Sequence, residues 1–328
     1  MSGYVTREDI DSLEPEWRDL VPGSNARTVF TSPTWVRTWW DVFRSAELEP
    51  MLLALRRDDR LHGVAPLMRR GESITFAGDT QICDYMDFTL AEGVEEKCLG
   101  TLLRSLSEQP WSELVFWALP EGSLTLALLP QVAEGLGYHV EVEMEDVCPR
   151  VNLPGSWEEY LAALSKKDRH ELRRKLRRLY ETSDEVVLEG LRTPTEIESA
   201  MEDFLRLHVI SRSDKATFMT EPMQEFFRRI VLALAAEGRA RLSFLKVDGV
   251  RTASLICFDS EKDLLLYNSG YDPDYSHLSV GLLSKALALE EAILEGKECF
   301  DFLRGAEVYK YHLGASDSRV YRCTVRRN

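Results

Sequence analysis

The sequence lacks any apolar run near the roughly 18 residues that a membrane-spanning helix needs. Residues 1–18 are polar and acidic, without the basic stretch followed by an apolar one that marks a signal peptide. The six cysteines are widely spaced, and none forms a CxxC pair or has a histidine at metal-ligand spacing. We therefore expect a soluble, cytoplasmic protein with mostly reduced cysteines and no bound metal.

Positive charge is also scarce, because 40 Lys and Arg residues oppose 55 Asp and Glu residues and leave a formal net charge of −15. This balance argues against general nucleic-acid binding, which depends on neutralising phosphates. A chain of 328 residues is about twice the size of a common domain. We expect two domains, residues 1–150 and residues 151–328, each able to bury its own core.

The first half alternates between helical and strand patterns. Ser32 and Pro33 resemble a helix start, and Trp35, Trp39 and Phe43 then recur at a spacing that places them on one helix face, more often core than ligand platform. Three short runs separated by turns predict a β-meander. The meander comprises residues 51–57, 61–68 and 73–77, and helices at 95–106 and 123–136 and strands at 113–118 and 139–144 follow.

The second half repeats part of this pattern. A strand at 242–247, a turn at Asp248 and Gly249, and strands at 253–258 and 264–268 match the first meander in order and length. Either the unit occurs twice or two hairpins are alike by chance. We also predict a last strand, residues 319–325, that returns to the first sheet.

A strongly basic segment lies near the start of the second half. Residues 166–178 contain eight Lys or Arg residues against two acidic ones, and Leu172, Leu176 and Leu179 form an apolar stripe at helical spacing. We expect the helix to dock by that stripe. Its basic face is either solvated or contacts an anion, such as a CoA phosphate, a nucleotide-linked acceptor or tRNA.

Two later segments carry polar chemistry. Residues 271–281 form a turn-rich loop that leads into a helix from about Leu282 to Leu294, where helix N–H groups could hold a phosphate, or where Ser279 could simply cap the helix. Residues 300–314 follow a short strand and concentrate charged side chains. Strand ends are common ligand sites in α/β folds, although a solvated loop with salt bridges would also explain this composition.

The run Phe300-Asp301-Phe302-Leu303-Arg304-Gly305, with Glu307 and Tyr309-Lys310-Tyr311, resembles the C-terminal signature of an acetyltransferase family. This family is related to the cellulose-biosynthesis protein CelD and belongs with the FemAB-like tandem GNAT proteins. Further matches span most of the chain: residues 166–178, Leu207-His208, Arg212, Phe218, Tyr267, Gly270, Asp272-Pro273, Ser279, Gly281 and the segment from Ser32 to Trp35. The several glycines of the usual GNAT nucleotide-binding turn are missing.

The resemblance implies a mixed α/β (α+β) fold of two GNAT-like domains, each a mostly antiparallel sheet flanked by helices. It implies acyl transfer from acyl-CoA, for example acetyl-CoA, with Lys310 as oxyanion donor or phosphate clamp and Asp301, Glu307 or His312 as proton acceptor. Arg304 could instead pair with Asp301 or Glu307. The remaining candidates are Ser279, Val280 and Gly281 for the donor, and Arg212, Tyr267, Arg304, Tyr311, Asp84 and Tyr85 for the acceptor.

Three functions follow from these patterns. The first is an N-acyltransferase that moves groups other than aminoacyl to an amino group of a sugar, nucleotide-sugar or cell-envelope precursor. The second is a Fem-type peptidyltransferase that uses aminoacyl-tRNA, which the acidity and the lack of a long heptad arm disfavour and the basic segment keeps open. The third is a non-catalytic binding module in envelope-polymer assembly.

Overall fold

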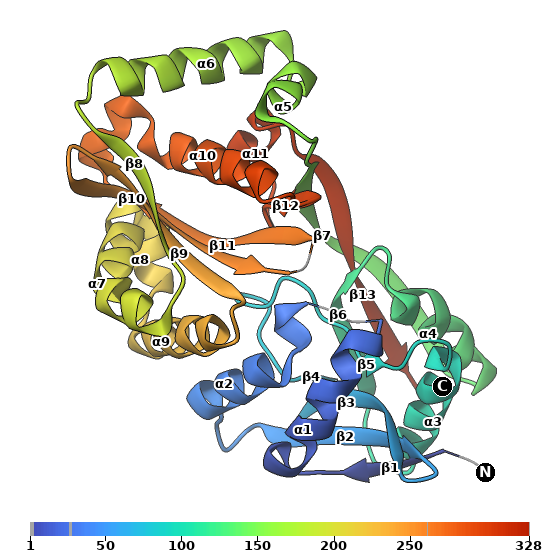
Figure 1. Cartoon of the computed structure of the whole chain (residues 1–328). Helices are drawn as coiled ribbons and strands as arrows, with labels where there is room; N and C mark the ends of the chain where they lie inside the picture. Colours follow the sequence, from blue (N-terminus) through green and yellow to red (C-terminus); the bar gives the residue numbers. More distant parts are fainter. Residues whose placement is uncertain (1–2, 26–27, 261, 328) are drawn as a thin grey trace. The chain divides into compact units, whose positions relative to one another are not determined.

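The computed structural model describes residues 3–25, 28–260 and 262–327 (Figure 1). The chain divides into two compact units. Unit 1 comprises Met1–Val147 and Ser318–Asn328, and unit 2 comprises Cys148–Asp317. Within the described ranges, no helix is both long enough and apolar enough to cross a membrane.

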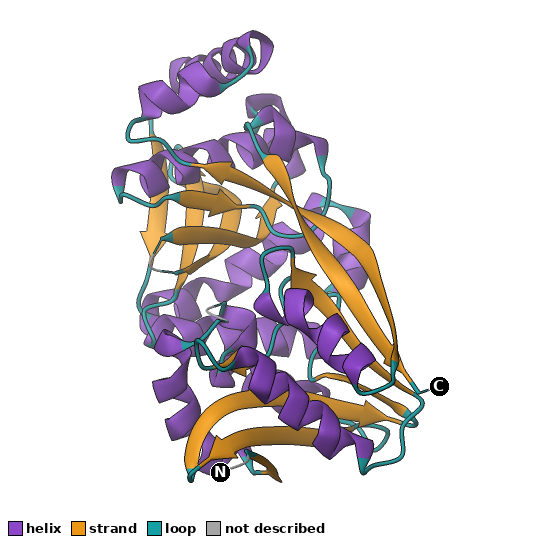
Figure 2. Ribbon diagram, turned by 90° about the vertical axis from the view of Figure 1, so that its right-hand side faces the viewer, coloured by secondary structure: helices purple, strands orange, loops and turns teal. Residues whose placement is uncertain are grey.

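Unit 1 is a mixed sheet with helices packed on it. Its strand order is β1-β2-β3-β4-β6-β13, in which only the pair β4 and β6 is parallel. Figure 2 shows the curved pair of long strands β2 and β3 at the bottom of the view. The elements are β1 (Tyr4–Arg7), α1 (Ile10–Leu20), η1 (Val21–Gly23), η2 (Val29–Thr31), α2 (Pro33–Phe43), β2 (Glu49–Arg57), β3 (Arg60–Arg70), β4 (Ser73–Phe76), β5 (Thr89–Leu90), α3 (Glu95–Ser107), β6 (Glu113–Pro120), α4 (Leu124–Gly135) and β13 (Ser316–Arg326).

Unit 2 has the strand order β8-β9-β10-β11-β12-β7, in which only β11 and β12 are parallel. In Figure 1, α10 and α11 lie on one side of this sheet and α7, α8 and α9 on the other. The elements are β7 (His139–Asn152), α5 (Trp157–Ala163), α6 (Lys166–Glu181), β8 (Val186–Leu191), α7 (Pro194–Ser211), α8 (Ser213–Phe218), α9 (Glu221–Ala236), β9 (Ala240–Val247), β10 (Val250–Asp259), β11 (Asp263–Tyr271), η3 (Pro273–Leu278), α10 (Val280–Leu294), β12 (Cys299–Asp301) and α11 (Val308–His312).

The two units share one succession of elements. In unit 1 the strands β1 to β4, helix α3 and strand β6 follow the same order and pairing as β8 to β11, α10 and β12 in unit 2. The predicted fold class and both predicted meanders are therefore confirmed. The last strand of each sheet is exchanged: β13, which contains the predicted strand 319–325, pairs with β6, and β7 pairs with β12.

Local chemistry explains the two hairpins. Asp58 and Asp59 have φ values of 50° and 61°, and Asp248 and Gly249 have φ values of 51° and 80°. Two consecutive left-handed residues make the two-residue turn whose twist matches that of the flanking strands, and Asp and Gly are the residues that tolerate it. Each hairpin is thus specified by its turn, as the sequence predicted.

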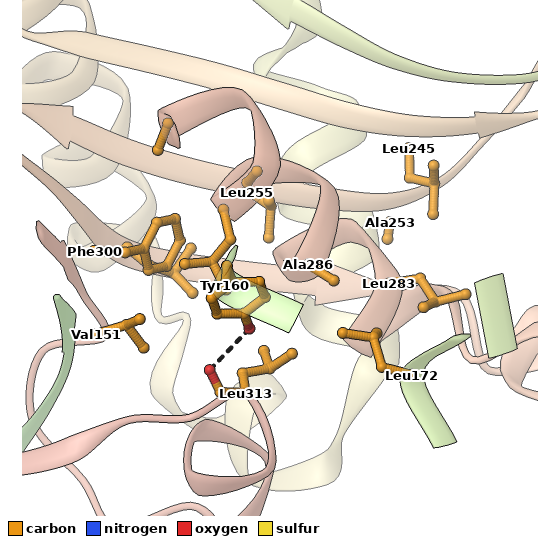
Figure 3. Close-up of a cluster of buried hydrophobic side chains, with 14 of the residues drawn as sticks. Val151, Tyr160, Leu172, Leu245, Ala253, Leu255, Leu283, Ala286, Phe300 and Leu313 are labelled. Carbon is orange, nitrogen blue, oxygen red and sulfur yellow. Dashed lines mark hydrogen bonds between the residues drawn. The ribbon is translucent and has the colours of Figure 1, made fainter. Parts of the chain in front are cut away.

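The core of unit 2 lies between its sheet and the helices α5, α6 and α10. Leu172 and Leu179 of α6 are buried in it, so the basic helix docks by its apolar stripe, as predicted. Figure 3 shows Tyr160 in this core, where its hydroxyl donates a 2.8 Å hydrogen bond to the carbonyl of Leu313. This bond holds the chain after α11 against α5.

The other face of the unit 2 sheet is packed by α7, which approaches β11 at Gly270. A Cβ atom there would lie 2.4 Å from the backbone nitrogen of His208 and 2.5 Å from the carbonyl carbon of Leu207. Backbone atoms cannot yield as a flexible side chain does. Gly270 therefore allows α7 to lie against β11.

We expect Gly270→Ala to destabilise the protein by about 3 kcal/mol, because overpacking against backbone forces α7 off the sheet. Gly122→Ala is the matched control, since a Cβ at Gly122 meets nothing within 4 Å. Urea unfolding would measure both. Equal midpoints for the two variants would show that the close approach of α7 is not required.

Candidate functional site

The most distinctive feature of unit 2 is the edge of β11. β12 pairs with β11 at only three positions, Asp263 with Cys299 to Leu265 with Asp301. Beyond Leu265, β11 continues to Tyr271, and no strand among the described residues pairs with that part on the β12 side. We call residues 266–271 the open edge. Such an edge offers backbone N–H and C=O groups to an extended ligand that contains amides.

A bulge lies at the start of the open edge. Ile256 pairs with Asn268 and Cys257 with Leu266, so Tyr267 is an extra residue in β11. Bulges re-aim side chains and are common beside active sites. The Tyr267 ring lies 5.3 Å from that of Phe227 and 4.7 Å from that of Phe258, which gives this predicted substrate residue a packing role.

The chain turns away from β11 directly after β12. Leu303 and Gly305 have φ values of 58° and 104°, in the left-handed region. The buried Lys310 ammonium donates to the carbonyls of Leu303 (3.0 Å), Arg304 (2.7 Å) and Gly305 (2.8 Å) and lies 2.9 Å from Glu307 Oε2. We call residues 303–307 the Lys310 loop. All three ammonium hydrogens are thus used in shaping this loop.

Asp301 anchors the start of the Lys310 loop. Its Oδ1 atom accepts a 2.8 Å hydrogen bond from the Leu303 backbone N–H, and its Oδ2 atom lies 3.3 Å from Arg150 Nε. Glu307 caps α11 and its side chain is half-exposed beside Lys310. The structure therefore brings Asp301, Glu307 and Lys310 to one loop. Their catalytic roles stay predictions.

The predicted donor residues lie where α10 begins. Ser279 has a left-handed φ of 59°, and its hydroxyl accepts a 3.1 Å hydrogen bond from Lys175 Nζ instead of capping the helix. A Cβ at Gly281 would lie 2.9 Å from the Tyr271 ring, so the helix start packs on the end of the open edge. The helix dipole and the Lys175 ammonium both favour an anion at Ser279, Val280 and Gly281.

Two further lysines near this edge went unnoticed in the sequence. Lys285 of α10 is 5% exposed, its Nζ atom donates to the Gly281 carbonyl (2.8 Å), and it lies 5.1 Å from the Tyr309 ring centroid. Lys215 of α8 donates to the Ser269 carbonyl of the open edge. The signal for Lys285 was a lysine within an otherwise apolar helical run, residues 282–289.

The pKa of Lys285 is lowered to about 7, mainly by burial and next by the charge of Lys215. Glu307 and the Cys257 thiol oppose this shift, and Lys310 adds to it. Burial likewise lowers the pKa of Lys215 to about 8, with a contribution from Arg212 that Asp214 and Glu307 oppose. Perturbed lysines of this kind cluster at functional sites.

His208 is a packed residue near the open edge. It is 1% exposed, and burial lowers its pKa to about 4, so the ring is neutral. Its ring contacts Asn268, the residue after the bulge. Asn268, Lys215 and Lys285 therefore all belong to the surroundings of β11, which no sequence motif revealed.

The other predicted acceptor residues are placed as follows. Arg212 is exposed and pairs with Asp214 at 2.9 Å, and the Tyr311 hydroxyl donates to Asp317 at 2.7 Å. Arg304 supplies a backbone carbonyl to the Lys310 loop. Asp84 and Tyr85 belong to unit 1, where the Tyr85 ring packs 6.3 Å from that of Phe30.

Unit 1 contains a surface hollow of about 1050 Å³ along α3, the end of α4 and the start of β1. None of the predicted site residues is among the side chains that line it. All six cysteines are buried and unpaired by disulfides. Among the residues the structure describes, no group of His, Cys, Asp and Glu side chains is arranged to hold a metal ion.

Part of unit 2 is similar to a known domain family. Residues 166–311 match the model of an acetyltransferase (GNAT) domain, a range that runs from the start of α6 into α11 and includes the open edge. No curated protein sequence matches the chain.

Solved structures show the same fold. The crystal structure of FemX matches with a TM-score of 0.66 at 12% identity, over 97% of this chain and 96% of that one. The C-terminal domain of a candidate lysylphosphatidylglycerol synthetase from Agrobacterium fabrum matches with a TM-score of 0.61 at 13% identity, over 96% and 92%. A conserved protein of unknown function from Bacteroides thetaiotaomicron VPI-5482 has a TM-score of 0.61 at 12% identity, over 98% and 99%.

We expect Lys310→Met to lower the free energy of unfolding by about 3 kcal/mol, because the carbonyls of Leu303, Arg304 and Gly305 and the Glu307 carboxylate lose their donor. Lys262→Met is the control, since Lys262 is exposed and its ammonium pairs with Glu298 at the surface. Chemical denaturation would measure both variants. A Lys310→Met protein as stable as the control would show that the loop does not depend on the ammonium.

We expect Lys285→Met to raise the free energy of unfolding at pH 7, whereas Lys310→Met lowers it. The folded-state pKa of Lys285 is lowered from 10.5 to about 7, so between these values the unfolded chain binds a proton that the folded chain lacks. Stability of the wild type therefore rises with pH, by at most about 1.4 kcal/mol per unit from this group. The difference in free energy of unfolding between Lys285→Met and the wild type, measured in urea, should therefore become smaller between pH 7 and pH 9. A pH-independent difference would contradict this.

Proposed function

We propose that the chain is an N-acyltransferase that moves an acyl group from acyl-CoA, such as acetyl-CoA, to an amino group of a sugar, nucleotide-sugar or cell-envelope precursor. The observation that carries the proposal is the open edge of β11, which ends at the N-terminus of α10. The match of residues 166–311 to an acetyltransferase domain supports it.

The two ends of this edge suit the donor. CoA has an extended arm with amide groups, which can pair with a free strand edge, and phosphates, which suit a helix N-terminus. Lys175 and Ser279 lie at that N-terminus, and Gly281 keeps it clear of a side chain that would strike Tyr271. The absence of further glycines is thus compatible with phosphate binding at this turn.

Acyl transfer to an amine requires a neutral amine and donors for the oxyanion of the tetrahedral intermediate. Glu307 is the predicted carboxylate that is half-exposed, so we assign it the amine proton ahead of Asp301, which is buried and bound to Leu303 N–H. Because Lys310 already donates to three carbonyls, backbone N–H groups of the open edge are better placed as oxyanion donors.

One observation keeps the Fem-type alternative in view. Helix α6 presents an exposed row that includes Arg174 and Arg177, with side chains 53% and 71% exposed. FemX shares the fold. A basic helix of this kind could contact the phosphates of an aminoacyl-tRNA donor.

We expect acetyl-CoA to raise the thermal unfolding midpoint of the wild type. Lys175→Met should weaken acetyl-CoA binding about fivefold, equivalent to roughly 1 kcal/mol, because it removes the cation beside Ser279. Lys262→Met, an exposed lysine in the same unit, is the control and should bind as the wild type does. Titration calorimetry would give the dissociation constants.

The same titrations with charged tRNA separate the alternatives. Stabilisation by tRNA alone would replace our proposal with the Fem-type one. A protein that binds acetyl-CoA but releases no CoA with any of a panel of amino sugars would support a binding module instead.

A further inference from the structure

Several cations gather around the open edge. Two of them have a carboxylate partner, because Arg212 pairs with Asp214 at 2.9 Å and Lys310 with Glu307 at 2.9 Å. Lys215 and Lys285 lie near the same strand. Within the described part of the chain, neither Lys215 nor Lys285 has a carboxylate within ion-pair distance. Two cations are therefore left over in a protein of net charge −15.

The two unpaired lysines approach one short stretch of β11 from different helices. Lys215, on α8, reaches the carbonyl of Ser269. Lys285, on α10, reaches the carbonyl of Gly281, and Gly281 packs on the ring of Tyr271. Ser269 and Tyr271 are two residues apart on one strand, a distance of about 7 Å. Helices α8 and α10 lie on opposite sides of the sheet (Figure 1). The charge of Lys215 nevertheless acts on Lys285, so the two amines approach each other at the open edge.

An ammonium taken out of water without a counter-charge is costly, and a protein offsets that cost by pairing it. Both lysines donate to backbone carbonyls, and Lys285 also lies 5.1 Å from the Tyr309 ring centroid. None of these partners carries a negative charge that would neutralise an ammonium. For Lys285 the accepting carbonyl is that of Gly281, four residues earlier in the same helix. The fold therefore does not need the Lys285 side chain for this hydrogen bond. The arrangement is that of a site for an anion.

We propose that Lys215 and Lys285 together bind an oxyanion, a carboxylate or phosphate group carried by one of the two reactants, at the end of the open edge. This inference rests on the proposed acyltransferase function and narrows its substrates to an acidic acceptor or an acidic acyl group.

The first test measures binding without turnover. Sodium acetate, succinate and phosphate are added at constant ionic strength, with chloride as reference, to the wild type, Lys215→Met, Lys285→Met, Lys175→Met and Lys262→Met. We expect one oxyanion to raise the unfolding midpoint of the wild type, Lys175→Met and Lys262→Met. In Lys215→Met and Lys285→Met the increase should be at most half as large. Binding should weaken as pH rises from 7 to 9, because the lysines lose their protons.

For Lys285→Met, folding does not confound this test, because the Gly281 carbonyl also accepts a hydrogen bond from the Ser284 hydroxyl (3.3 Å). Lys285→Arg, which keeps the charge, should retain part of the shift. Equal shifts in all five proteins would overturn the proposal, and so would a shift lost only in Lys175→Met, which would place the anion at the α10 N-terminus. Binding that strengthens with pH would mean that the lysines act as neutral amines, and would also overturn it.

The second test identifies the reactant through matched pairs that differ in one acidic group. Glucosamine is compared with glucosamine 6-phosphate, and glycinamide with glycine, using acetyl-CoA; butyryl-CoA is compared with succinyl-CoA on the better acceptor. We expect the acidic member of one pair to have a kcat/KM at least tenfold higher, and the ratio to fall to about one in Lys215→Met and Lys285→Met.

The two proposals fail differently. Turnover that is equal for acidic and neutral members in every variant would overturn the oxyanion site and leave the acyltransferase intact. An oxyanion shift that depends on Lys215 and Lys285, without CoA release from any pair, would keep the site and overturn the proposed function.

Discussion

Three backbone carbonyls, those of Leu303, Arg304 and Gly305, converge on the buried ammonium of Lys310. This contact holds the turn in which Leu303 and Gly305 have left-handed φ values, and Asp301 anchors the start of that turn. Without it, the chain after β12 could continue beside β11 as a longer parallel strand. The open edge, the position of Glu307 and the placement of α11 all follow from this turn.

The three lysines beside the open edge, Lys215, Lys285 and Lys310, thus contribute to the fold in two different ways. Lys310 is surrounded by acceptors and adds to stability, as expected for a hydrogen-bonded buried charge. Lys285 and Lys215 have been placed in a poorly solvated region without an acidic partner. Lysines that lower stability at a strand edge are expected where a functional requirement conflicts with the stability of the fold.

Much of the fold could be predicted because its signals are local. The turns at Asp58-Asp59 and Asp248-Gly249 specify their hairpins, and Ser32 accepts the predicted capping hydrogen bond from Trp35. The site was harder to predict from the sequence. The charged cluster at residues 300–314 was recognised, but not that the Lys310 ammonium donates to backbone carbonyls. That contact depends on the left-handed conformation of Leu303.

Other features escaped prediction because they depend on distant elements. Lys285 and Lys215 are 70 positions apart by residue number, and only the packing of α8 and α10 around β11 brings them together. Ser279 was predicted either to bind the donor or to cap the helix, and the hydrogen bond from Lys175 of α6 to its hydroxyl was not predicted. Neither the proximity of Lys215 and Lys285 nor the contact between Lys175 and Ser279 is marked by a periodicity or a motif within one segment of the sequence.

The exchange of last strands has a consequence for how the chain is made. Strand β6 of unit 1 is paired on one side by β13, whose residues are synthesised some 200 positions later. While the ribosome makes unit 2, the β6 edge of unit 1 waits with unpaired backbone groups, and strand edges of that kind attract other chains. Unit 1 is thus begun before unit 2, but its sheet is completed only after β13 has been made.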